Sequence, residues 1–267
     1  ISFDFRNLLT PFSQRDDDDF ESGPETGPRY TSGLGENGPL SDFNVEIKFV
    51  GEYRDDIATS FFAAAEYVSQ VVIGDLQEVR DGADLIDDVL ITARLINIDG
   101  AGGVLGRAGP TLIRTDGGLT ATGLMEFDIA DVQNALEDGI FDDIALHEML
   151  HVLGFGTLWD QQELTTNSTS SREFFIGSQA VAAYQSEFEM LVAPGVPLES
   201  SGGAGTAGSH WEDHIFTNEL MTGFIGDETF ISATSIASLG DLGYETIWSP
   251  DNPSATPPAF DSSMMIA

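Results

Sequence analysis

The chain has 267 residues, 41% of them hydrophobic, which is enough for one large domain or for two subdomains around a cleft. It carries 45 acidic residues against 10 lysines and arginines, and a formal net charge of −35 argues against nucleic acid or anionic membranes as partners. Because cysteine is absent, disulfides and thiolate metal sites are excluded, while the acid-rich, lysine-poor composition favours an extracellular protein.

The first 42 residues are rich in Asp, Gly, Pro and Ser, with four consecutive aspartates at 16–19. This composition predicts an extended, solvated segment that wraps the domain. From Phe43 to Val50 apolar and polar residues alternate, which predicts a half-buried strand. Residues 55–73 have apolar side chains at helical spacing, which indicates an amphipathic helix that packs on a sheet and ends at Gly74.

Three more strands are predicted at 88–98, 110–114 and 120–127, with glycine-rich loops around Gly102, Gly103 and Gly106, and a short helix follows at 128–136. This order favours an α+β or α/β layer architecture, a mixed sheet backed by helices. After residue 156 the chain becomes loop-rich. The elements expected there are a loop at 161–178, a helix at 179–192, a Gly/Pro/Ser loop at 195–208, a helix at 232–242 and a proline-rich tail at 249–267.

The segment His147–His151 reads H-E-M-L-H. Two histidines four residues apart lie on one face of an α-helix, so their imidazoles can converge on one metal ion. Neutral imidazole suits Zn²⁺, and Glu148 lies where its carboxylate can take a proton from a water beside the metal, as in zinc hydrolases. A match this short also arises by chance. However, the chain has four histidines in all, and the apolar residues around the pair predict a buried helix, in which histidines need partners.

A zinc peptidase takes three protein ligands and keeps a fourth position open. The compact metzincin pattern has its third ligand ten residues after the first histidine, but that residue here is Thr157, which is not a credible ligand. The residues alone leave several candidates open for the third ligand: Asp160, Glu187, Glu189, His210 and His214.

Beyond this motif the chain resembles the leishmanolysin family of metzincins. Gly154-Phe155 follows the motif, and after a long insertion come G-T-A-G-S-H-W-E at 205–212 and N-E-L-M-T-G at 218–223. The similarity extends upstream to A-G-P at 108–110 and G-L-M-E-F-D at 123–128, and downstream to A-S-L-G-D-L-G-Y at 237–244. It covers roughly Asp84 to Tyr244, and together these motifs are far more specific than the histidine motif alone.

The resemblance implies a zinc-dependent endopeptidase with His210 as the third ligand, separated from His151 by an insertion of 58 residues. It also implies that Met221 lies in a turn beneath the metal. Gly223, rather than a tyrosine, follows Met221 by two residues, so a tyrosine that stabilises the oxyanion is absent at that position.

The fold implied is α+β and metzincin-like. An upper subdomain, 43–156, has a mixed twisted sheet and two long helices above a cleft, and a smaller, mostly irregular or helical lower subdomain spans 157–248. Residues 1–42 form the N-terminal extended segment and 249–267 the tail.

The eukaryotic leishmanolysins are cysteine-rich and often lipid-anchored, whereas this chain resembles the cysteine-free bacterial relatives. The apolar end Met264–Ala267 is too short for a C-terminal anchor signal, so we expect no membrane anchor, and a thiol-based latency switch is excluded. The chain starts at Ile1 rather than Met, which suggests a processed or trimmed form.

We therefore expect a secreted, monomeric zinc endopeptidase that acts on proteins or peptides, with Glu148 as the general base. The alternative is a catalytically idle binding or adhesion module that keeps zinc as a structural brace. Glu148 separates the two, because a structural site has four protein ligands and needs no base.

Two further sites are predicted. The strand at 120–127 lies just before the zinc helix and is expected to be an antiparallel edge that holds an extended peptide through Gly123, Leu124, Met125 and Glu126. A calcium site is expected outside the catalytic site, with a solvated acidic surface as the alternative. Its carboxylates would come from Asp81, Asp84, Asp87, Asp88 and Asp99.

Overall fold

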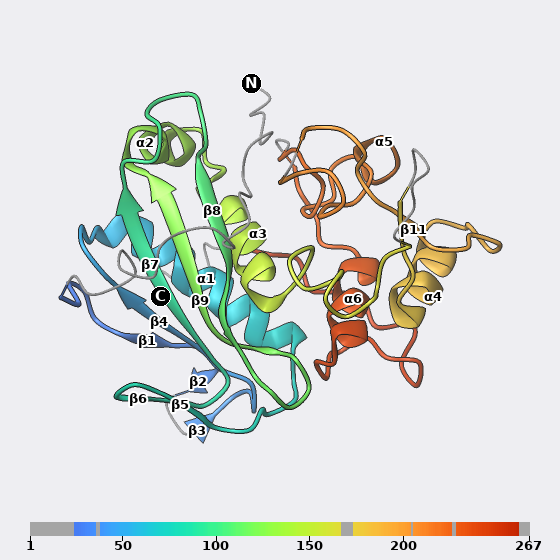
Figure 1. The fold of residues 1–267 in the computed structure, drawn as a ribbon, viewed down its shortest axis with the longest axis horizontal. Helices are drawn as coiled ribbons and strands as arrows, with labels where there is room; N and C mark the ends of the chain where they lie inside the picture. Colours follow the sequence, from blue (N-terminus) through green and yellow to red (C-terminus); the bar gives the residue numbers. More distant parts are fainter. Residues whose placement is uncertain (1–23, 36–37, 167–172, 204, 226–227, 262–267) are drawn as a thin grey trace.

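The computed structural model describes residues 24–35, 38–166, 173–203, 205–225 and 228–261. Over these ranges the chain is α+β, with a five-stranded mixed sheet and six helices (Figure 1). The predicted aspartate run at 16–19 and the short apolar end at 264–267 lie outside the described residues. The division of the chain at residues 42, 156 and 248 stays a prediction.

The main sheet has the strand order β1-β4-β7-β9-β8. Its central strands β4 (Val45–Phe49), β7 (Val89–Ile96) and β9 (Thr120–Asp128) are parallel, and the edge strands β1 (Tyr30–Thr31) and β8 (Gly106–Ile113) are antiparallel to their neighbours. All four predicted strands are present. The strand expected at 110–114 starts earlier, because Gly106 pairs with Phe127 and the glycine leaves room for the ring of Phe127.

The prediction that the 120–127 strand is an edge is wrong. β9 pairs with β7 on one side and with β8 on the other, and all its residues are buried. Gly123, Leu124, Met125 and Glu126 therefore have no free strand edge to offer. A Cβ on Gly123 would lie 2.3 Å from Val152, so this glycine lets the next helix pack directly on β9.

Two helices, α1 (Asp55–Val71) and α3 (Phe141–Leu153), pack against one face of this sheet. Phe61 of α1 and Phe141 of α3 pack on the strand residue Phe127, with ring centroids 5.5 and 5.2 Å from it, in the edge-to-face geometry that aromatic pairs prefer. The short helix α2 (Ile129–Glu137) precedes α3 and is capped by Asp128, whose carboxylate accepts the Ala130 N–H. All three helices were predicted.

Short hairpins fill the remaining parts of the first half. They are β2 (Leu34–Gly35) with β3 (Gly38–Pro39), and β5 (Val79–Asp81) with β6 (Asp84–Ile86). No helix in the described ranges has the length and apolar character needed to cross a bilayer.

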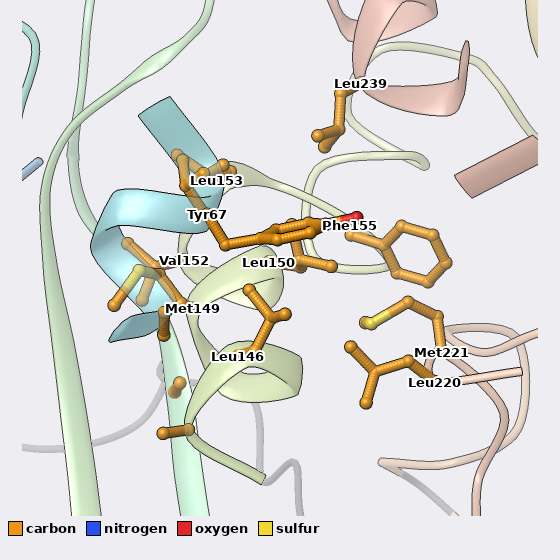
Figure 2. Packing of buried hydrophobic residues seen from close by; sticks show 14 of the residues in the cluster. Tyr67, Leu146, Met149, Leu150, Val152, Leu153, Phe155, Leu220, Met221 and Leu239 are labelled. Carbon is orange, nitrogen blue, oxygen red and sulfur yellow. The ribbon is translucent and has the colours of Figure 1, made fainter. Parts of the chain in front are cut away.

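After Gly154 regular structure is sparse: β10 (Phe174–Phe175), α4 (Ser178–Glu187), β11 (Val196–Pro197), α5 (Asp213–Phe216) and α6 (Ala233–Leu242). Helix α4 ends earlier than the predicted residue 192, because Glu189 has a φ of +55°, which a helix cannot contain. Trp159 and Trp211 stack at the centre of this part, with Phe155 and Phe175 packed around them. Figure 2 shows Phe155, Leu220 and Met221 of this part in the same apolar cluster as Leu146 and Leu150 of α3.

Candidate metal centre

Helix α3 places two histidines on one face, one turn apart. His147 and His151 are both buried, and their Nε2 atoms are 3.0 Å apart. The helix then ends at Gly154, whose φ of +113° is a left-handed cap that a residue with a side chain rarely adopts. The chain can therefore turn away immediately after the second histidine.

The third histidine comes from the loop-rich part. His210 is buried, and its Nε2 is 3.1 Å from the Nε2 of His147 and 3.1 Å from that of His151. Gly156 makes this approach possible, because it has a φ of +69° and a Cβ there would lie 2.3 Å from the carbonyl oxygen of Ser209. The end of α3 and the segment carrying His210 are thus in backbone contact.

A backbone carbonyl orients each imidazole through its other nitrogen. Nδ1–H of His147 donates to the carbonyl of Leu220 at 2.8 Å, that of His151 to Phe155 at 2.8 Å, and that of His210 to Thr206 at 3.1 Å. Since a carbonyl can only accept, Nδ1 carries the proton and Nε2 of the neutral ring presents its lone pair. Three lone pairs therefore converge on one point, which is the arrangement that metal-binding histidines adopt.

The protonation of these rings also suits a cation. Burial lowers the pKa of His147 to about 4 and that of His210 to about 3, and burial together with the two neighbouring rings lowers the pKa of His151 well below its ordinary value. All three are therefore neutral at physiological pH, as metal ligation requires. Nitrogens bound to tetrahedral zinc at 2.0–2.1 Å lie about 3.3 Å apart, close to the separations found here.

Glu148, between the two helix histidines in sequence, is fully buried. Neither of its carboxylate oxygens has a hydrogen-bond partner among the residues that the structure describes. Burial raises the pKa of Glu148 to about 8, and a nearby cation would lower it again by favouring the charged form. A buried carboxylate of this kind is costly unless it has a partner, so a carboxylate that is next in sequence to one of three converging imidazoles fits a bound dication.

The other candidates for third ligand lie elsewhere. Asp160 accepts a hydrogen bond from the hydroxyl of Thr165, and Glu187 accepts the N–H groups of Ala233 and Thr234 at the start of α6. Glu189 and His214 are exposed. Thr157 instead donates its hydroxyl to the carbonyl of His151 at 2.8 Å. Of the residues left open by the sequence, only His210 joins the other two histidines in the described parts of the chain.

Met221 lies in a tight segment next to this centre. It is fully buried, its N–H donates to the carboxylate of Glu219 at 2.6 Å, and its carbonyl accepts the N–H of Trp211 at 3.0 Å. The turn is thereby joined to the residue that follows His210. Sequence reasoning missed the carbonyls of Leu220, Phe155 and Thr206, because every residue has a carbonyl and no pattern marks those that hold a ligand.

The five carboxylates of the expected calcium site do not come together. Asp84 pairs with Arg29 and Lys48, and Asp99 accepts the N–H of Val104 within its own loop. Asp87 and Asp88 approach Asp75 instead, and Asp88 already accepts two backbone N–H groups. Asp75 and Asp87 are exposed, and exposed acidic groups commonly gather without a cation, so a calcium site is not supported here.

Comparisons with known proteins agree with the site. The model of the leishmanolysin family matches residues 78–249, more than half of the chain. Leishmanolysin of Leishmania donovani is 28% identical over 173 residues, which cover 62% of this chain and 28% of that protein. The ciliated left-right organizer metallopeptidase of Xenopus laevis is 28% identical over 119 residues, which cover 38% of this chain and 16% of that protein. A leishmanolysin-like peptidase of Drosophila melanogaster is 32% identical over 72 residues, which cover 27% of this chain and 10% of that protein.

The chain thus spans less than a third of the length of these relatives. The matched range nevertheless contains the helix with both histidines, the segment with His210 and the turn with Met221. The chain belongs to the leishmanolysin family.

Proposed function

We propose that this protein is a secreted, zinc-dependent endopeptidase. His147, His151 and His210 would hold the metal, and Glu148 would act as the general base. One observation carries the proposal: three unprotonated Nε2 atoms converge within 3.1 Å of one another, next in sequence to a buried carboxylate whose oxygens have no partner among the described residues.

A zinc ion held by three histidines keeps a fourth position open, lowers the pKa of water there to about 7 and polarises a carbonyl. Glu148 would accept the proton of the attacking water and deliver it to the nitrogen of the leaving amine. The three carbonyls behind the imidazoles would keep the ligand nitrogens aimed at the metal.

The strand that would bind substrate is β8. Among the described residues it is the sheet edge next to α3 and pairs with a strand on one side only. Backbone N–H and C=O groups on its other side could pair with an extended peptide, except at Pro110, which has no N–H. Pro110 pairs with Gly123, the residue that contacts Val152 in the last turn of α3, so this edge runs level with His151. A peptide added to β8 would therefore pass close to the metal ligands.

The idle zinc-braced module is disfavoured by the ligand set. A structural zinc site is closed by four protein ligands, whereas the described residues bring three together and leave Glu148 without a partner. Extracellular location rests on the acidic, cysteine-free composition. Detection of the protein in the culture medium of its source, rather than in the cells, tests that part.

Glu148→Gln tests the catalytic assignment. The amide cannot take the proton of the water, so hydrolysis of a casein-type substrate should fall by roughly 10²–10⁴-fold. Zinc content and the far-UV circular dichroism spectrum should be unchanged. Wild-type turnover in that variant would refute the role of Glu148, and a zinc content near zero in the unmodified protein would refute the metal site.

A further inference from the structure

The turn beside the metal centre contains a second buried carboxylate, Glu219, which the proposed reaction does not use. Its side chain is fully buried and accepts four hydrogen bonds from neutral donors. Oε2 accepts the N–H of Met221 at 2.6 Å. Oε1 accepts the N–H and hydroxyl of Ser232, at 3.0 and 2.9 Å, and the hydroxyl of Ser235 at 2.5 Å.

These hydrogen bonds are linked to His147 through a single residue, Leu220. Leu220 lies between Glu219 and Met221, and its carbonyl is the acceptor for Nδ1–H of His147 at 2.8 Å. Its N–H is in turn fixed by the carbonyl of Phe230 at 2.8 Å. With Glu219 anchored at α6 and the N–H of Met221 held by its carboxylate, the direction of the Leu220 carbonyl is set.

The same carboxylate is also connected to the segment of the third ligand. Ser235 accepts the indole N–H of Trp211 at 2.8 Å while it donates to Glu219. Trp211 follows His210, and its backbone N–H donates to the carbonyl of Met221. Glu219 therefore lies at the junction of the start of α6, the turn and the chain that carries His210.

The chemistry of the donors explains why this residue is an acid. The N–H groups of Met221 and Ser232 face different carboxylate oxygens, and a backbone N–H cannot become an acceptor. A glutamine would place its NH₂ group against one of them whichever way its amide was turned. An uncharged isostere of the same size therefore cannot satisfy this pocket.

Building on the proposed function, we infer that Glu219 is a positioning residue of the metal site, which fixes the Leu220 carbonyl and thereby aims Nε2 of His147. Groups that orient a ligand histidine typically change metal affinity by 10- to 100-fold when removed. Because Glu219 acts through one intervening residue, Glu219→Gln should weaken zinc binding by about 10-fold, at the lower end of that range.

The test compares Glu219→Gln with Glu187→Gln in the full chain. Glu187 accepts two backbone N–H groups and one hydroxyl at the start of the same helix, α6, but has no bond to the turn. Zinc affinity is measured by competition with a chelator, the fold of the chelated protein by far-UV circular dichroism, and the ligand field by the visible absorption of bound Co²⁺. We expect a weaker zinc affinity and an altered Co²⁺ spectrum for Glu219→Gln alone, with both chelated variants folded.

Equal zinc affinity and Co²⁺ spectra for Glu219→Gln and the unmodified chain would overturn the inference, as would the same loss of affinity in Glu187→Gln. Should Glu219→Gln not fold, Ser235→Ala replaces it, since it removes one donor to Glu219 and the acceptor of Trp211; unchanged zinc affinity in that variant overturns the inference. An unmodified chain that binds no zinc would instead overturn the proposed function together with it.

Discussion

The parts of the molecule before and after Gly154 differ in how much paired strand and apolar core they contain. Before it, five paired strands and two helices supply the larger share of one apolar core, which continues into the second part. After it, elements are short, and buried or half-buried carboxylates accept the N–H groups of the backbone. Glu199, for example, accepts those of Ser200, Ser201 and Asp213, while its own N–H donates to the carbonyl of His210.

Helices α4 and α6 show the second mode most clearly. Glu187 at the end of α4 accepts the first N–H groups of α6, and Asp241 near the end of α6 accepts those of Gln179 and Ala180 at the start of α4. Each helix thus satisfies the unpaired N–H groups of the other and places a negative charge at its positive end. A chain with many acids, few cations and no cysteine can fasten its loops in this way without disulfides or ion pairs.

The candidate metal centre lies where these two parts meet. His147 and His151 come from α3 of the sheet part, whereas His210 comes from the loop-rich part. A metal bound there would connect them, and its contribution should be greatest for the part that has the smaller core.

Removal of zinc should therefore lower the stability more than any other change, and it should affect the part after Gly154 more than the part before it. A metal that binds only the folded state adds about 4 kcal/mol at a free concentration 1,000 times its dissociation constant. After chelation we expect a lower melting temperature and faster hydrogen exchange in the residues after Gly154, with the central strands still protected. Uniform loss of protection across both parts would break the distinction between them.

Gly156→Ala should disturb the contact between the two parts. The new methyl group would lie 2.3 Å from the carbonyl oxygen of Ser209, and the φ of +69° is unfavourable for alanine. We expect a loss of about 1–3 kcal/mol in the free energy of unfolding, together with weaker zinc binding, because His210 follows Ser209. Gly139→Ala is the matched control, since Gly139 has a φ of +72° but no atom within 4 Å of its Cβ position. The Gly139→Ala variant should be less stable but bind zinc as tightly as the unmodified chain. Equal zinc affinities for Gly156→Ala and Gly139→Ala would contradict the account.

Asp241→Ala should test the reciprocal capping of α4 and α6. It leaves the N–H groups of Gln179 and Ala180 without their acceptor, which should lower the free energy of unfolding by about 1 kcal/mol, as loss of a helix cap does. Urea unfolding monitored by tryptophan fluorescence measures the change. Asp251→Ala, at an exposed position, serves as the control, and equal midpoints for the two variants would show that the capping bonds contribute nothing.

The smallest effect is expected at the ion pairs of the sheet part. The hydrogen bond from Arg29 lowers the pKa of Asp84, so the pairing stabilises the fold above the ordinary pKa of an aspartate and is lost as the pH falls through the lowered value. At this partly exposed site Asp84→Asn should cost about 0.5 kcal/mol at neutral pH, and less in 1 M salt. The effect of Asp241→Ala should be much less sensitive to salt. An equal salt dependence for both variants would remove the distinction between ion pairs and carboxylate–backbone bonds.

How far the sequence predicted this structure depends on the range of the interactions. Periodicity located the strands and helices of the first half, because each pattern is local. It could not give the lateral order of strands, so β9 was expected at an edge although β8 covers it. The H-E-x-x-H spacing indicated two of the converging histidines, whereas His210 required the resemblance, since the residues alone left five candidates.

Other features have no sequence signature. The partners of Glu187, Glu219 and Asp241 are backbone N–H groups, which every residue except proline has, so no pattern of side chains announces them. For the same reason the expected calcium cluster was not found. It was predicted from acids that are close in sequence, whereas in the fold Asp84 pairs with Arg29 and Asp88 accepts backbone N–H groups.

Anomalous diffraction at the zinc absorption edge, from crystals of the zinc-loaded protein, tests the central claim most directly. The account predicts a single strong peak bound by Nε2 of His147, His151 and His210 at about 2.0–2.1 Å, with Glu148 close by but not a ligand. A peak with Asp160, Glu187, Glu189 or His214 in place of His210, or no peak at the three histidines, would contradict it.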